Sequence, residues 1–90
     1  MRVTGTLKFF YENELYGFFV GDADGRDLFF HFDDIKASNP NFTTDYLTMI
    51  ARDPFVTLRF AYSKLNYFGR YGLSMKAVNI VFIGMVYCSI

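Results

Sequence analysis

The chain has 90 residues, of which 52% are hydrophobic and 21% aromatic, and its nine Lys and Arg balance nine Asp and Glu. This length allows one small domain and excludes a multidomain enzyme. The 12 Phe and 7 Tyr exclude a solvated, disordered chain. The single cysteine, Cys88, cannot form a disulfide within the chain, which is typical of a reducing compartment. The first residues lack the apolar stretch of a signal peptide, so we expect a cytoplasmic protein.

The neutral total charge hides an asymmetry between two parts of the chain. Residues 1–38 carry four basic and seven acidic side chains (net −3), and residues 39–90 carry five and two (net +3). Formal charge alone therefore argues neither for nor against a nucleic-acid partner. The longest uncharged run, residues 77–90, has 14 residues. A spanning helix needs about 20 apolar residues, so we expect no membrane span.

Short strands separated by turn residues follow one another along the first third of the chain. Residues 3–11, 15–21 and 26–32 are rich in β-branched and aromatic side chains, which favours three strands. The pair Asp24-Gly25 favours a tight turn between the second and third. These segments predict an antiparallel meander.

The middle of the chain predicts one short helix. Thr44 or Asp45 could cap it. Its apolar side would consist of Tyr46, Leu47, Met49 and Ile50.

Two further strands are expected at residues 55–62 and 72–80, joined by a long hairpin loop at 63–71. The sequence thus predicts an all-β fold, a small five-stranded antiparallel barrel with a short helix between the third and fourth strands. We expect the domain to comprise residues 1–80.

Residues 81–90 form an apolar C-terminal extension that either lengthens the fifth strand or forms a sixth. An exposed apolar edge must be covered, so this extension should pack on its own barrel or on a second copy of the chain. We therefore expect a homodimer or another form of self-association through this extension.

No residue pattern supports catalysis, a metal site or a cofactor site. His31 and Cys88 lie in distant segments with no third group to orient them, and together they cannot close a metal site. The acidic residues near the turns lack the flanking pattern of a calcium loop, and no phosphate-binding glycine motif occurs. We expect no enzyme activity, no metal and no cofactor.

Aromatic side chains alternate along the second and third predicted strands. Phe19 and Phe30 are expected in the core, together with Leu28, Leu58 and Phe60, and Phe10 fits the core and the surface equally well. Because side chains alternate with a period of two, the intervening positions share the outer face: Tyr16, Phe18, Phe29 and His31. Stacking on unpaired bases requires such a solvent-facing cluster of flat rings.

Three segments resemble the cold-shock domain, an OB-fold barrel of five strands: residues 5–10 (GTLKFF), 16–20 (YGFFV) and 27–35 (DLFFHFDDI). The resemblance continues weakly through the fourth strand and residues 77–80. It implies that single-stranded DNA or RNA binds across the first three strands, with Lys8 at a phosphate or base edge and Phe9 in place of a stacking Trp. The full set of binding residues implied is Lys8, Phe9, Tyr16, Phe18, Phe29, His31, Phe32 and Phe42.

The chain also departs from the family pattern. Glu14-Leu15 stand where the family has Lys-Gly, and Tyr11 and Glu12 stand where small polar residues are usual. An anion beside a phosphate path should weaken binding, because affinity for nucleic acid is largely electrostatic. Two hypotheses therefore stay open. One is a single-strand binding module acting as an RNA chaperone or a regulator of transcription or translation. The other is a protein-interaction or dimerisation domain with weakened or lost nucleic-acid binding.

Overall fold

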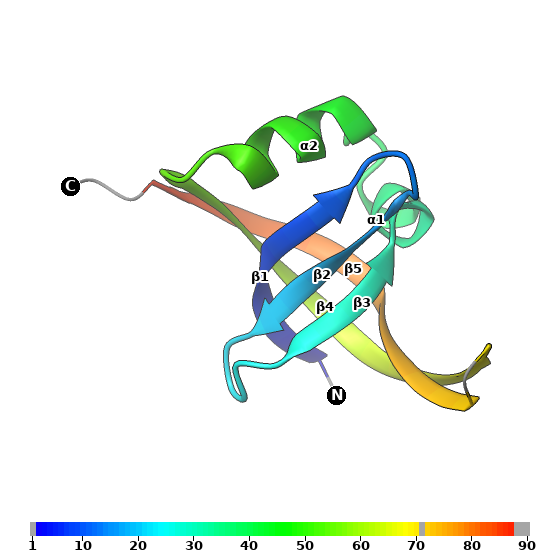
Figure 1. Cartoon of the computed structure of the whole chain (residues 1–90). Coiled ribbons are helices and arrows are strands. Elements are labelled where there is room, and N and C mark those ends of the chain that lie inside the picture. Colours follow the sequence, from blue (N-terminus) through cyan, green and yellow to red (C-terminus); the bar gives the residue numbers. More distant parts are fainter. Residues whose placement is uncertain (1, 71, 88–90) are drawn as a thin grey trace.

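The computed structural model describes residues 2–70 and 72–87 and has an all-β barrel as its main body (Figure 1). Its strands are β1 (Arg2–Tyr11), β2 (Tyr16–Gly21), β3 (Asp27–His31), β4 (Val56–Gly69) and β5 (Gly72–Tyr87). Helices α1 (Phe32–Ser38) and α2 (Thr44–Arg52) lie between β3 and β4 in the chain. The strands close in the order β1-β2-β3-β5-β4, which confirms the predicted small OB-fold-like barrel. No helix in the described part of the chain is long and apolar enough to cross a membrane.

One strand pairing departs from the predicted antiparallel arrangement. β3 and β5 run parallel where Phe29 pairs with Lys76, whereas the other neighbouring strands are antiparallel. A parallel neighbour needs a long crossover connection, and α1, α2 and β4 supply it. This pairing closes the barrel.

β4 and β5 are much longer than the sequence predicts. The expected long loop is wrong for residues 63–69, because these residues pair with β5 from Ser63 and Val78 to Gly69 and Gly72. Gly72, the first residue of β5, has a φ of 105°, which a glycine adopts without strain. Polar residues such as Asn66 therefore belong to paired strands.

The end of β4 and the start of β5 leave the barrel as a two-stranded ribbon (Figure 1). β4 pairs with β1 as far as Ser63, and β5 pairs with β3 at Lys76. Across the ribbon, residues 66–69 pair with 72–75, and residues 64 and 65 pair with 77 and 76 at its base. We call residues 64–69 and 72–75 the arm.

The C-terminal residues described by the structure belong to the barrel. Of the two alternatives for residues 81–90, lengthening of the fifth strand is confirmed, since β5 continues to Tyr87 and pairs with β4 as far as Val56. The expected domain boundary after Ile80 therefore falls inside a strand. Cys88 and the last two residues lie outside the described part of the chain.

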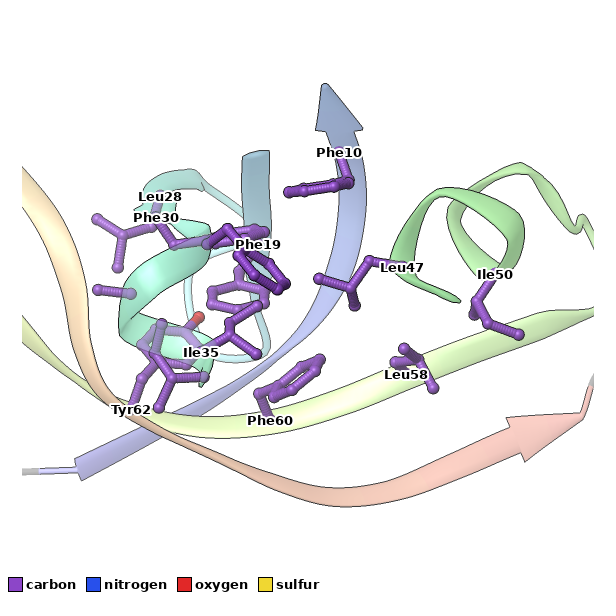
Figure 2. Close-up of a cluster of buried hydrophobic side chains, with 13 residues drawn as sticks. Phe10, Phe19, Leu28, Phe30, Ile35, Leu47, Ile50, Leu58, Phe60 and Tyr62 are labelled. Carbon is purple, nitrogen blue, oxygen red and sulfur yellow. The ribbon is translucent and has the colours of Figure 1, made fainter. Parts of the chain in front are cut away.

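The core combines aromatic rings from alternate strand positions with aliphatic side chains from the strands and both helices (Figure 2). Phe19 and Phe30 stack with ring centroids 4.3 Å apart, and Phe19 also stacks on Tyr62 at 4.9 Å. All three side chains are fully buried. The predicted core residues Leu28, Leu58 and Phe60 are confirmed, and Phe10 is buried as well.

The predicted helix is present as α2, with two differences. Its N-cap is Thr43, whose hydroxyl accepts a hydrogen bond from the backbone N–H of Tyr46 at 3.1 Å, and not Thr44 or Asp45. Leu47 and Ile50 are buried, whereas Met49 is exposed. The buried stripe is therefore narrower than expected.

Candidate nucleic-acid interface

Ring side chains from the first three strands gather on the outer face of the sheet. We call this group the platform: Phe9, Tyr11, Tyr16, Phe18, Phe29 and His31. The strand register aligns it in two rows, in which Phe9 pairs with Phe18 and Phe18 with Phe29, and Tyr11 pairs with Tyr16 and Tyr16 with His31. The outer positions expected from alternation are thus brought together.

Neighbouring rings of the platform support one another. The Tyr16 centroid lies 5.2 Å from that of Tyr11 and 5.3 Å from that of Phe29, and Phe18 and Phe29 meet edge to face at 6.1 Å. Phe9 is 47% exposed and Tyr11 45%, whereas the rings of β2 and β3 are half-buried. The result is a continuous aromatic surface that faces solvent.

An irregularity at Lys8 puts Phe9 and Tyr11 on this face. Leu7 pairs with Phe19 but Phe9 pairs with Phe18, so Lys8 is an extra residue in β1. Without such a bulge, simple alternation would turn Phe9 inward and Phe10 outward. The bulge therefore explains both the burial of Phe10 and the addition of Tyr11, which the sequence analysis missed. The spacing of Tyr11 two residues after Phe9 was the pattern that could have revealed it.

Gly17 keeps β1 close to β2 beneath the two rows. A Cβ atom at this position would touch the backbone carbonyl of Phe9 and come within 2.8 Å of the Phe30 ring. Any side chain at Gly17 would thus displace both the backbone of Phe9 and a core ring.

His31 ends β3 and begins α1, a helix that the sequence analysis did not predict. Its Nδ1 accepts a hydrogen bond from the backbone N–H of Asp33 at 3.1 Å and so caps the helix. In the neutral ring the proton is then on Nε2. His31 therefore keeps one ring donor that the cap does not use.

Two expected binding residues do not join the platform. Phe32 is the first residue of α1, so strand alternation has already stopped, and its side chain is 6% exposed and packs 5.9 Å from Phe10. A ring buried in this way is not available for stacking. Phe42 is half-buried against Tyr46 and Phe82, where these rings line an apolar cavity of about 480 Å³. No ring contact among the described residues links Phe42 to the platform.

The cations beside the platform already have acidic partners. The Lys8 ammonium lies 3.1 Å from both carboxylate oxygens of Asp27 and 5.3 Å from the centre of the Phe9 ring. On β5, next to Phe29, the Lys76 ammonium is 3.7 Å from the Asp34 carboxylate. Lys8 thus lies next to the rings as expected, but its charge is matched by an acid.

The turn between β1 and β2 holds Leu15 in a conformation that glycine adopts more readily. Leu15 has a φ of 59°, a left-handed conformation that costs a residue with a side chain roughly 1–2 kcal/mol. Its N–H donates to the Tyr11 carbonyl at 2.9 Å, and its carbonyl accepts from the Phe32 N–H at 2.8 Å. These two hydrogen bonds hold the turn, and the strand expected from residue 15 begins at Tyr16.

Comparison of the chain with models of protein families, with curated proteins and with solved structures gives no match. Among the described residues, no group of three or more His, Cys, Asp or Glu side chains is placed to hold a metal ion. Interpretation of the platform therefore depends on its geometry and chemistry.

Proposed function

We propose that the protein binds single-stranded DNA or RNA by stacking unpaired bases on the platform. The observation that carries this proposal is the alignment of Phe9, Phe18 and Phe29 across three adjacent strands on a solvent-facing sheet. The row of Tyr11, Tyr16 and His31 runs beside it. Stacking on such rings contributes about 1–3 kcal/mol per base and depends little on sequence.

The ion pairs at the platform determine how strongly the affinity should depend on salt concentration. A phosphate that approaches Lys8 must compete with Asp27, which already occupies the ammonium. Few counterions are then released per bound strand, so the affinity should fall only slowly with salt. We therefore propose a stacking-dominated binder without catalysis. The resemblance to the cold-shock domain supports a role as an RNA chaperone or a regulator of transcription or translation.

Fluorescence anisotropy of a labelled oligo-dT and its RNA counterpart tests this function at low and moderate salt. We expect micromolar or tighter binding, and a loss of about 5- to 150-fold for Phe18→Ala and for Phe29→Ala. Phe55→Ala is the matched control, because this ring is 49% exposed but lies outside the platform. Absence of binding at low salt, or an equal loss in the control, would contradict the proposal.

A protein-interaction function is the second candidate, and the matched charges favour it. Aromatic surface with few unpaired charges is also typical of the centre of a protein interface. If Phe29→Ala abolishes binding of a protein partner while no oligonucleotide binds, this candidate replaces the first.

Self-association through the end of β5 is a separate part of the proposal. Ile83 and Tyr87 are 49% and 72% exposed and lie on a strand that the barrel needs, so truncation at Ile80 would damage the fold. Sedimentation of the wild type beside Ile83→Glu and Tyr87→Glu is the better test. We expect a wild-type dimer that the substitutions dissociate, and a monomeric wild type would contradict it.

A further inference from the structure

The outer face of the sheet does not end at the platform. Phe29 pairs with Lys76 of β5, and Lys76 pairs with Leu65 of β4. The row that begins at Phe9 therefore continues across two more strands onto the arm. Because side chains alternate, Tyr67 lies on the same outer face, two residues beyond Leu65.

Lys76 places a cation at the junction between the platform and the arm. Its ammonium is 5.7 Å from the centre of the Tyr67 ring and 3.7 Å from the Asp34 carboxylate. The Lys76 and Asp34 side chains both keep about 30% of their surface exposed. A phosphate can therefore approach this ammonium from solvent.

We propose that a bound single strand continues from the platform onto the arm, where Tyr67 stacks on a base and Lys76 contacts the adjoining phosphate. This inference rests on the proposed function. The phosphate takes the place of Asp34 as the partner of Lys76. Strand spacing and rise place the backbones of Phe29 and Tyr67 roughly 12 Å apart. That span corresponds to at most about four nucleotides at the spacing of a stacked strand.

The opposite face of the arm provides a matched control. Phe68 follows Tyr67 directly and is 87% exposed, but alternation and its pairing with Leu73 place it on the other face. If exposure alone determined binding, Phe68 would matter more than Tyr67. If the continuous outer face determines it, only Tyr67 matters.

The first test is a length series of labelled oligo-dT measured by anisotropy on the full chain at low salt. An oligonucleotide of about four nucleotides should bind wild type and Tyr67→Ala with equal affinity, because it fits on the platform alone. For an oligonucleotide of about ten nucleotides, we expect Tyr67→Ala to lower the affinity about 5- to 150-fold and Phe68→Ala to leave it unchanged. Tyr67→Phe should retain the affinity, and equal denaturation midpoints for both alanine variants exclude a folding effect.

A second test looks for a gain of binding. Asp34→Asn releases Lys76, so the longer oligonucleotide should bind more tightly, with a salt slope steeper by about 0.7. Asp45→Asn is the control, because Asp45 also lies in the first turn of a helix, whereas the ion pair of Lys76 is with Asp34. Its slope should equal that of the wild type.

The outcomes separate this inference from the proposed function. If Phe18→Ala abolishes binding but Tyr67→Ala and oligonucleotide length have no effect, the arm is not part of the site and the platform is. An equal loss for Phe68→Ala would also overturn the inference, because the outer face would then not define the path. If the wild type binds no oligonucleotide at low salt, both proposals fail.

Discussion

The inner and outer faces of β2 and β3 use the same residue type for different purposes. On the inner face, Phe19 and Phe30 are fully buried, with stacked rings 4.3 Å apart. On the outer face, Phe18 and Phe29 meet edge to face at 6.1 Å and are half-exposed. Position within the pleat therefore decides whether a phenylalanine stabilises the barrel or forms a recognition surface.

The largest expected effect separates the two faces directly. Phe30→Ala should lower the free energy of unfolding by about 3–5 kcal/mol, because it leaves a cavity among packed rings. Phe29→Ala should lower it by only about 1 kcal/mol, since its ring already contacts solvent. Chemical denaturation of both variants measures the difference. Equal losses would show that the outer ring is part of the core.

Gly17→Ala should disturb both faces through one methyl group. The added Cβ meets the Phe9 carbonyl and the Phe30 ring, so we expect a loss of about 1–3 kcal/mol in the free energy of unfolding. Gly84→Ala is the control, because a Cβ there has no neighbour within 4 Å. Thermal unfolding of the pair tests this, and similar midpoints would refute the close approach.

Tyr62→Phe tests a hydroxyl that is buried in the core. Among the described residues, the buried Tyr62 hydroxyl has no hydrogen-bond partner, and burial raises the pKa of this phenol. Removing an unpaired buried hydroxyl should stabilise the protein by about 1 kcal/mol. A loss of stability in denaturant titrations would mean that the hydroxyl is hydrogen-bonded in solution.

The smallest effect concerns the ion pair between Arg59 of β4 and Asp22, which follows β2. Hydrogen bonds from Arg59, at 2.5 and 3.2 Å, and from Thr4 lower the pKa of Asp22 below its ordinary value of 3.8. The charged carboxylate thus stabilises the folded state above pH 3.8, and this contribution is lost as the pH falls through the lowered pKa. Melting temperatures of wild type and Asp22→Asn should therefore differ at neutral pH and converge in acid. A constant difference would contradict the linkage.

The barrel and most of the platform follow from features that are local in the sequence. Alternation assigned Phe18 and Phe29 to one face and Phe19 and Phe30 to the other, because a period of two needs no knowledge of the partner strand. The bulge at Lys8 depends on how β1 meets β2, so Phe10 stayed ambiguous and Tyr11 was missed.

The sequence-based expectations differ from the structure where the same residue types are common in two kinds of local structure. Asp33 and Asp34 suit a turn as well as the first turn of a helix, and the choice of helix moved Phe32 from the surface into the core. Asn66 and Gly69 suggested a loop, yet they pair with Met75 and Gly72. Pairing between distant segments decided both cases.

The arm also has a consequence for hydrogen exchange along a single strand. A two-stranded ribbon is only marginally stable by itself, so its amides can open without the barrel. Amides of β4 before Ser63 should therefore exchange only on global unfolding, whereas those from Lys64 to Gly69 should exchange much faster. A single strand bound across Lys76 and Tyr67 would slow the exchange of amides in the arm. The slowly exchanging part of β4 would then extend beyond Ser63 toward Gly69.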